Sequence, residues 1–377
     1  MGEVMTASTD KRSVTSLVRA GVEPAAGYRP GTADHSHHPS ARLDMNESPF
    51  GLSPKAQAVL DAYTDGNRYP DFLQAPLREA LSAYTDVPAE RIIPGAGLDD
   101  VFETLALLLI EPGDEVIICE PTFGVYRSLM TMHGAVIVNV PLTPKPDFRL
   151  DVDAILAAIT EKTKLIMLCQ PNNPTGTLMP REDIERIVTG APSVIVGIDE
   201  AYAEFAQTSH IDLANAHENV VIFRTLSKFA GLAGYRVGYG IFPDALVPYL
   251  NRVAPPFFNI SAISSEIAIA SLNDLDVLNE RLNVLLAERA QLSANLGEIE
   301  GVTVYPSATN FILADLPVAT SEPLLKELAE RHVYVRRFGI PEHDLTQALR
   351  ISIGSPEDNR LFLETFTELL EHHRVSH

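Results

Sequence analysis

Residues 164–202 read KLIMLCQPNNPTGTLMPREDIERIVTGAPSVIVGIDEAY and predict a strand, a loop, a helix and a second strand. The apolar run in each predicted strand is continuous rather than alternating, which is typical of strands buried on both faces of a sheet. Residues 181–188 between them are expected to be helical. A strand, a helix and a strand in succession predict parallel pairing, with the helix packed on the sheet.

The same pattern extends over the chain from about residue 90 onward. Helices are expected at 99–110, 125–133, 151–160 and 181–188. Seven short strand-like runs accompany them, namely RIIPGAG (91–97), DEVIICEP (114–121), AVIVNVPL (135–142), KLIMLCQP (164–171), SVIVGIDEAY (193–202), VVIFRTLS (220–227) and RVGYGIF (236–242). The fold class is therefore expected to be α/β, a three-layer sandwich around a mostly parallel sheet of about seven strands.

The chain changes character after about residue 260. Residues 262–300 are predicted to be helical, and further helices are expected near 321–331 and from Pro356 to about Val375. Two strand-like runs, VYVRRF and ALRISIG, lie among them. These elements predict a smaller α+β unit that the N-terminal segment completes. We expect an N-terminal arm with part of the small domain at 1–52, a large domain at 53–260 and a small C-terminal domain at 261–377.

Composition excludes several classes of partner. The chain has 29 Lys and Arg against 50 Asp and Glu, a net charge of −21, which argues against binding to nucleic acid or to an anionic membrane. No apolar segment reaches the ~18 residues of a membrane helix, and no signal-peptide core is apparent. The two cysteines, Cys119 and Cys169, are expected to be buried thiols rather than a disulfide or a metal-binding pair, which suits a cytoplasmic protein.

A histidine cluster lies in the polar N-terminal region. His35, His37 and His38 belong to the segment HSHH within residues 1–40. A mobile arm is favoured over a metal site there, because no fourth ligand is suggested. No metal is therefore expected.

Polar residues follow several predicted strands at the edge where open α/β sheets bind ligands. The Gly-rich turn before Asp99 opens a helix and can present backbone N–H groups to a phosphate, although such a turn is often only a tight connection. Phe123 can cover a flat ring or be a core aromatic. Asn173 lies between two prolines that fix its loop. Asp199 leaves an apolar strand, so its buried carboxylate needs a partner.

Lys228 completes this set. It lies in TLSKFAGLAGYRVGYG (225–240), a mostly apolar and Gly-rich run that also contains Arg236. One ligand uses a phosphate cradle, an aromatic face, an amide, a carboxylate and an amine together, and that ligand is pyridoxal 5′-phosphate. A carboxylate keeps its ring nitrogen protonated, and a lysine amine binds its aldehyde.

The sequence also resembles a known family, the fold-type-I pyridoxal-phosphate-dependent aminotransferases, and within them the histidinol-phosphate aminotransferase branch. The resemblance covers nearly the whole chain. Its motifs, in order, are RLDMNESPFGLSPKA, NRYPD, GAGLDD, PTFGVY, PNNPTGT, DEAYAEF, RTLSKFAGLAGYRVGY, PSATNFIL and LRISIG.

The resemblance implies a role for each matching residue. Lys228 is the Schiff-base lysine and proton shuttle, and Asp199 pairs with the ring nitrogen. Tyr202 and Asn173 bind the ring oxygen, and Phe123 stacks on the ring in place of the more usual tyrosine. The cofactor phosphate is held by Gly97, Leu98, Asp99, Ser227 and Arg236, and by Tyr69 from the second copy of a homodimer.

Substrate residues are implied in the same way. Arg350 resembles the arginine that holds the substrate anion, and Arg336 resembles a second anion contact; a structural salt bridge is the alternative for each. The neighbouring Arg337 stands where an acidic residue is expected. Asn46 is expected to close over the site or to be a turn residue.

The implied reaction is a ping-pong transfer of an amino group between an anionic amine and a keto acid, with histidinol phosphate and 2-oxoglutarate as the expected pair. The alternatives are an aromatic or specialised-metabolite aminotransferase and a decarboxylase of a phosphorylated amino acid. A non-catalytic binding or regulatory protein is disfavoured because Lys228 and Asp199 are both present. A Rossmann dehydrogenase is disfavoured by the missing third glycine.

Overall fold

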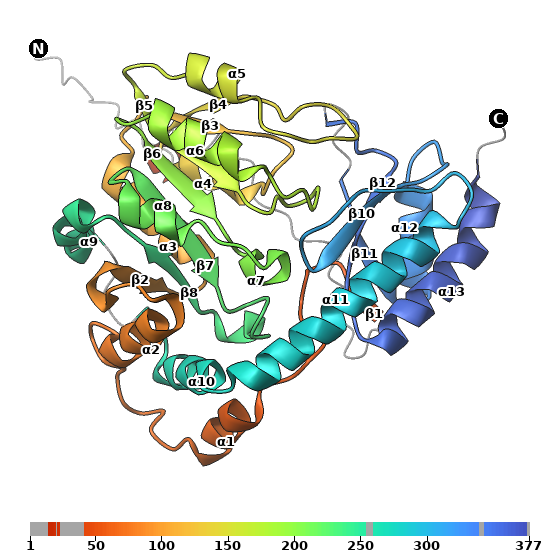
Figure 1. The fold of residues 1–377 in the computed structure, drawn as a ribbon, viewed down its shortest axis with the longest axis horizontal. Helices are drawn as coiled ribbons and strands as arrows, with labels where there is room; N and C mark the ends of the chain where they lie inside the picture. The colour runs from red at the N-terminus through yellow and green to blue at the C-terminus, as the bar shows by residue number, and fades with distance from the viewer. Residues whose placement is uncertain (1–13, 20, 23–40, 254–258, 339–342, 375–377) are drawn as a thin grey trace, which may run out of the picture.

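The protein forms two β-sheets with helices packed around them (Figure 1). The computed structural model describes residues 14–19, 21–22, 41–253, 259–338 and 343–374. The histidine cluster His35, His37 and His38 lies outside the described residues, as does most of the predicted N-terminal arm. Among the described helices, none is long and apolar enough to cross a bilayer.

The larger sheet contains the seven strands expected from the sequence. Its order is β2-β8-β7-β6-β5-β3-β4, and every neighbouring pair among β7, β6, β5, β3 and β4 is parallel. Only β8 runs antiparallel to its neighbours in this sheet. The strands are β2 (Ile92–Gly95), β3 (Glu115–Ile118), β4 (Val136–Asn139), β5 (Thr163–Cys169), β6 (Ile195–Asp199), β7 (Val220–Thr225) and β8 (Gly238–Ile241). The prediction of a mostly parallel sheet is confirmed.

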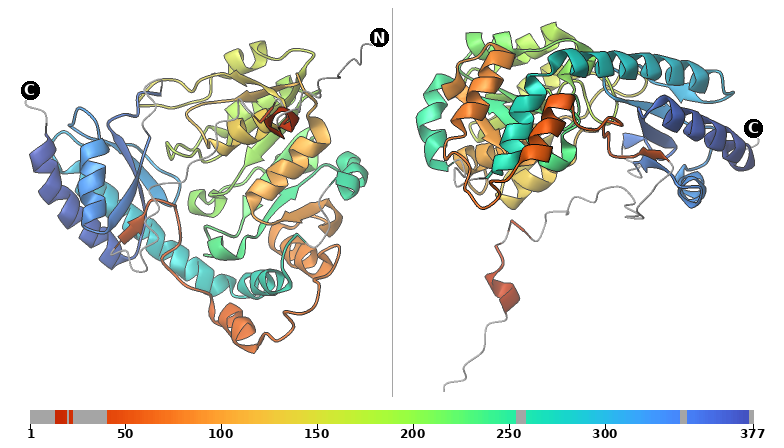
Figure 2. Two further views of the ribbon diagram at one scale, coloured as in Figure 1. Left: turned by 180° about the vertical axis from the view of Figure 1, so that it is seen from behind. Right: turned by 90° about the horizontal axis from the view of Figure 1, so that it is seen from below.

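Helices cover both faces of this sheet, so the fold has the three layers that were expected (Figures 1 and 2). Along β5, Leu165 and Met167 pack in one hydrophobic cluster, whereas Ile166 and Leu168 pack in another. The first cluster includes residues of α3 (Leu98–Leu109) and α4 (Val125–Met132), and the second includes residues of α5 (Val152–Ala157) and α6 (Arg181–Gly190). Burial on both faces explains why these strands are continuously apolar.

The smaller sheet has five strands in the order β1-β11-β12-β10-β9. The N-terminal strand β1 (Ala41–Leu43) pairs in parallel with β11 (Val333–Arg337), although about 290 residues separate them in the chain. The other strands are antiparallel, namely β9 (Thr303–Val304), β10 (Phe311–Asp315) and β12 (Ala348–Ser352). Two helices accompany this sheet, α12 (Glu322–Glu330) and α13 (Pro356–His373). The latter begins with a capping box formed by Ser355 and Asp358.

The predicted helical region 262–300 is two helices, α10 (Ala262–Leu272) and α11 (Leu275–Gly297). They are separated at Asp274, whose carboxylate accepts a hydrogen bond of 2.7 Å from the backbone N–H of Lys55. Figure 1 shows α11 running from α10 to the smaller sheet. The helices α1 (Pro54–Ala62) and α2 (Ala75–Thr85) pack against α10, as the view from below in Figure 2 shows. The remaining helices are α7 (Ala203–Ala206), α8 (Ile211–Ala216) and α9 (Val247–Val253).

The turn between β2 and α3 lies directly against β8. A Cβ atom on Gly238 would lie 2.5 Å from the backbone nitrogen of Leu98 and 2.7 Å from the carbonyl carbon of Gly97. Backbone atoms cannot move aside as the end of a flexible side chain can. A glycine at 238 is therefore required for β8 to approach this turn.

We predict that Gly238→Ala lowers the free energy of unfolding by roughly 1–3 kcal/mol, because the added methyl group overpacks a rigid contact. Urea unfolding measures the change. The matched control is Gly51→Ala, where the added Cβ would meet nothing within 4 Å. Equal stability of the two variants would show that β8 does not constrain the turn.

Candidate active site

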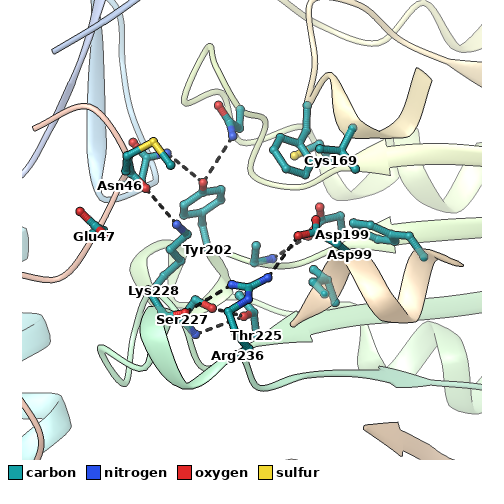
Figure 3. A pocket seen from close by; sticks show the side chains of 18 of the residues that line it. Asn46, Glu47, Asp99, Cys169, Asp199, Tyr202, Thr225, Ser227, Lys228 and Arg236 are labelled. Carbon is teal, nitrogen blue, oxygen red and sulfur yellow. Dashed lines mark hydrogen bonds and ion pairs between the residues drawn. The ribbon is translucent and has the colours of Figure 1, made fainter. Parts of the chain in front are cut away.

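A cavity of about 380 Å³ opens at the carboxyl ends of the central strands (Figure 3). The last residue of β6, Asp199, and the loops after β5 and β7, which contain Asn173 and Lys228, contribute to its wall. Residues from the smaller sheet and its N-terminal connection close the opposite side. Eleven predicted site residues line the cavity, namely Asn46, Leu98, Asp99, Phe123, Asn173, Asp199, Tyr202, Ser227, Lys228, Arg236 and Arg350. The predicted residues Gly97, Tyr69 and Arg336 do not.

The amine of Lys228 reaches across this cavity. Its Nζ donates a hydrogen bond of 3.1 Å to the carbonyl oxygen of Met45, in the segment that follows β1. Burial, assisted by the positive charge of Arg350, lowers the pKa of Lys228 to about 8. A substantial fraction of the amine is thus neutral near pH 8 and can act as a nucleophile or base.

Asp199 is the last residue of β6 and is only 3% exposed. Its Oδ2 accepts a hydrogen bond from the hydroxyl of Tyr126, and its Oδ1 accepts one of 3.0 Å from the backbone N–H of Ala201. Burial raises the pKa of Asp199 to about 6, although these two bonds act in the opposite direction. The carboxylate is therefore mostly ionised at neutral pH and is available to a cationic partner.

Tyr202 is the centre of a hydrogen-bonded network. Its hydroxyl oxygen accepts a bond of 2.9 Å from Asn46 Nδ2 and one of 3.4 Å from Asn173 Nδ2. Asn46, which adopts a positive φ of 54°, also accepts a bond of 3.0 Å from the hydroxyl of Ser352. The network fixes the two amides and directs the phenol into the cavity beside Lys228 (Figure 3). Burial raises the pKa of Tyr202, so the phenol stays protonated.

Arg350, on β12, provides a buried cation at the other end of the cavity. It is 7% exposed, and its guanidinium donates bonds of 2.7 Å to Asn173 Oδ1 and to the carbonyl oxygen of Asp44. The guanidinium carbon also lies 5.2 Å from the ring centroid of Phe311 and 5.5 Å from that of Phe338. These contacts hold the cation in place in an otherwise acidic protein.

Arg336, the second predicted substrate arginine, and its neighbour Arg337 lie in different positions. Arg336 is paired in register with Arg350 across β11 and β12, and its guanidinium lies 5.9 Å from the Phe338 ring. Arg337 contacts α12 instead: it donates to Thr320 Oγ1 at 3.3 Å and lies 3.7 Å from Glu322. The residue at 337 that differs from the family pattern is thus engaged outside the cavity.

The start of α3 forms an anion cradle. Gly97 is the N-cap, has a φ of +86° and makes no side-chain capping bond, so the first N–H groups of α3 are available to a ligand. A Cβ on Gly97 would lie 2.1 Å from the guanidinium of Arg236, which packs directly over the turn. Arg236 also pairs with Asp99 at 3.2 Å. Together with the hydroxyl of Ser227, this donor set fits a phosphate group.

Phe123 and Tyr69 lie in very different settings. Phe123 lines the cavity and meets Tyr126 edge to face, with ring centroids 5.5 Å apart. Tyr69 is 82% exposed in the single chain.

The state of the two cysteines agrees with the prediction from the sequence, since Cys119 and Cys169 are both buried and free.

Sequence reasoning missed several residues of the site. Tyr126 was within the quoted motif PTFGVY, but nothing in the sequence links it to Asp199. Phe311 and Phe338 were within the motifs PSATNFIL and VYVRRF, yet their contact with Arg350 depends on strand pairing. Thr225 could have been found, because it precedes Ser227 in the same strand-end motif; its hydroxyl donates to Ser227 Oγ at 2.9 Å.

Comparison with known proteins agrees with this geometry. The sequence profile of the aminotransferase class I and II family matches residues 40–366. A histidinol-phosphate aminotransferase of Roseiflexus castenholzii is 38% identical, over 95% of this chain and 99% of the relative.

Two solved structures show the same fold. The histidinol-phosphate aminotransferase of Sinorhizobium meliloti, solved in complex with pyridoxal 5′-phosphate, has a TM-score of 0.85 and 26% identity over 94% of this chain and 97% of its own. The N-succinyldiaminopimelate aminotransferase of Mycobacterium tuberculosis has a TM-score of 0.77 and 26% identity over 87% of this chain and 92% of its own. The chain therefore belongs to the class I and II aminotransferases, in the histidinol-phosphate aminotransferase branch.

Proposed function

We propose that this aminotransferase binds pyridoxal 5′-phosphate in the cavity and transfers the amino group of histidinol phosphate to 2-oxoglutarate. One observation carries the proposal: Lys228 and Asp199 face the same cavity, between an anion cradle and a buried arginine. The names of the relatives support the choice of substrate. A cytoplasmic location fits this proposal, since both cysteines are free thiols.

The residues around the cavity fit the cofactor group by group. The N–H groups at Leu98, with Ser227 and Arg236, suit its phosphate. Asp199 suits the protonated ring nitrogen, and Phe123 offers an aromatic face to the ring. Tyr202 and Asn173 suit the ring oxygen. When bound, pyridoxal phosphate supplies an aldehyde that reacts with amines and a ring that withdraws electrons from the substrate carbon.

The side chains then divide the work of proton transfer. The neutral amine of Lys228 would accept the proton from the substrate carbon that bears the amino group and return it to the cofactor carbon on the other side of the same nitrogen, so that one base serves both steps. The ionised carboxylate of Asp199 holds the positive charge on the ring nitrogen throughout. Tyr202 and Asn173 would keep the cofactor ring in one orientation, so that the reacting carbon stays directed at the amine of Lys228.

Arg350 is the proposed anion-binding residue of the substrate site, with Arg336 beside it on the neighbouring strand β11. A guanidinium held by Asn173 and two aromatic rings presents a fixed fork to a phosphate or a carboxylate. Asn46 and the half-exposed Glu47 line the same end of the cavity. This end therefore accepts the phosphate of histidinol phosphate in one half-reaction and a carboxylate of 2-oxoglutarate in the other.

We predict that the bound cofactor gives the purified, pyridoxal-phosphate-loaded protein a visible absorbance band. Addition of histidinol phosphate is expected to remove this band, and addition of 2-oxoglutarate is expected to restore it. Stopped-flow absorbance measures both half-reactions separately. Phenylalanine and glutamate are run in parallel. The variant Lys228→Ala serves as the control, because it keeps the cavity but lacks the amine.

Each outcome of this experiment has a distinct meaning. A band that responds to phenylalanine but not to histidinol phosphate retains the aminotransferase and overturns the proposed substrate. Full activity in Lys228→Ala contradicts the role of the lysine. Failure of the wild-type protein to bind pyridoxal phosphate at all contradicts the cofactor proposal.

We also propose that the enzyme is a homodimer in which Tyr69 of each copy reaches the cofactor phosphate of the other. Tyr69 lies in a segment of exposed apolar residues, in which Phe72 is 46% and Leu73 is 51% exposed. Exposed aromatic and aliphatic side chains that gather in one segment are typical of a protein interface. The exposure of Tyr69 is compatible with such a role in the second subunit.

Complementation between two inactive variants tests the shared site. We predict that Tyr69→Ala and Lys228→Ala are each nearly inactive, whereas a mixture refolded together recovers activity. In a mixed dimer, one site combines Lys228 from one chain with Tyr69 from the other, and that site is intact. Recovery to about a quarter of the wild-type activity is expected from random pairing. A mixture no more active than its parts would place Tyr69 outside the partner's site.

The lowered pKa of Lys228 gives a prediction about stability in the cofactor-free protein. In the folded state this pKa is about 8, against an ordinary value of 10.5. Between these values the unfolded chain binds more protons than the folded chain, so the lysine becomes less destabilising as pH rises. We predict that the stability advantage of Lys228→Met over wild type is largest at neutral pH and shrinks above pH 8.

Urea unfolding at neutral and at alkaline pH measures this difference. The control is Lys326→Met, at a lysine of α12 that is 70% exposed. It measures how the loss of a surface lysine changes the free energy of unfolding, and this change is subtracted from that of Lys228→Met. An advantage that is constant or grows with pH would mean that Lys228 is not held in a neutral form.

A further inference from the structure

Tyr126 is a fully buried tyrosine whose hydroxyl donates to Oδ2 of Asp199. It belongs to α4, and Asp199 ends β6, so the bond joins two elements that are 73 residues apart in the chain. The proposed reaction assigns Tyr126 no contact with the substrate, and Tyr126 does not line the cavity. Its hydroxyl nevertheless contacts the carboxylate on which the proposed chemistry depends.

The ring of Tyr126 is fixed by its neighbours. The ring of Phe102 meets it edge to face at a centroid distance of 5.3 Å, and the ring of Phe123 does so at 5.5 Å. Phe102 and Phe123 both line the cavity. A phenol held on two sides donates its hydrogen bond in one direction only, which in turn restricts the rotation of the carboxylate that accepts it.

Asp199 requires such support because its surroundings disfavour a negative charge. Cys169 on β5 is its partner in register, and Asp99 on α3 and Glu200, the next residue, act on it as like charges. Lys228, after β7, lies across the cavity. The groups that favour the ionised form by direct bonds are the backbone N–H of Ala201 and the hydroxyl of Tyr126.

We propose that Tyr126 is a positioning residue that orients Asp199 and keeps it ionised for the ring nitrogen of the bound cofactor. This inference rests on the proposed function, since it assumes that pyridoxal phosphate binds beside Asp199. Tyr126 acts through the carboxylate and not on the cofactor itself. The hydroxyl, and not the ring, carries the effect.

The test is the affinity of the cofactor-free protein for pyridoxal phosphate as a function of pH. Tyr126→Phe removes the hydroxyl and keeps the ring contacts. Without the donor, the carboxylate takes up a proton at higher pH, so the acid-side midpoint of the binding profile is expected to rise by about one pH unit. The cofactor phosphate titrates in the same range in every variant, so the shift between variants is the readout.

The matched control is Tyr239→Phe. Tyr239 lies on β8, is 1% exposed and belongs to the hydrophobic cluster on the opposite face of the sheet from Tyr126. Its variant loses an equally buried hydroxyl and is expected to leave the midpoint unchanged. An equal shift in both variants overturns the proposal, because the cause is then a general loss of packing.

A double-mutant cycle with Asp199→Asn separates this inference from the proposed function. If Tyr126 acts through the carboxylate, Tyr126→Phe has little further effect on affinity or on the pH profile once Asp199 is replaced. Additive effects overturn the role of Tyr126. If Asp199→Asn binds pyridoxal phosphate with the affinity and pH profile of the wild type, the proposed role of Asp199 fails first.

Discussion

The buried ion pair between Glu200 and Arg224 is the interaction on which the geometry of the site depends. Arg224 donates to Glu200 Oε2 through Nε and Nη2, each at 3.0 Å, and so joins the ends of β6 and β7. Side chains alternate along a strand, so Asp199 and Thr225 face the cavity while Glu200 and Arg224 face the other side. The residues that contact the cofactor or substrate in our proposal are thus positioned by the Glu200–Arg224 ion pair, which itself contacts neither ligand.

Both members of this ion pair have further hydrogen-bond partners. Glu200 also accepts bonds from Ser209 and from the backbone of His210, and Arg224 contacts Glu204 at 3.3 Å. Burial alone would raise the pKa of Glu200, but His210 and Arg224 hold it below its ordinary value. A buried pair that loses one partner leaves an uncompensated charge, so both residues are constrained together.

The seven strands, the four helices α3, α4, α5 and α6 between them and the strand-end residues could be predicted from the sequence because each depends on a local pattern. The short helices α7 and α8, between β6 and β7, were not predicted. The helices α1 and α2 precede the region where that pattern begins and were not predicted. The contacts of Tyr126 with Asp199 and of Phe338 with Arg350 depend on which elements lie side by side, and no local pattern encodes this. The domain boundaries at residues 52 and 260 stay a prediction.

The hydrogen bonds between Asn46 and Ser352 and between Arg350 and Asp44 each join residues that are 306 positions apart. Contacts of such long range form late, because closing the intervening chain is entropically costly. All seven strands of the central sheet, by contrast, lie within residues 92–241. During synthesis, Asp44 and Asn46 therefore lack their contacts with Arg350 and Ser352 until those two residues have left the ribosome, whereas Tyr202, which also bonds Asn46, is made much earlier. The end of the cavity that contains Arg350 is therefore completed only after all seven strands of the central sheet have been made.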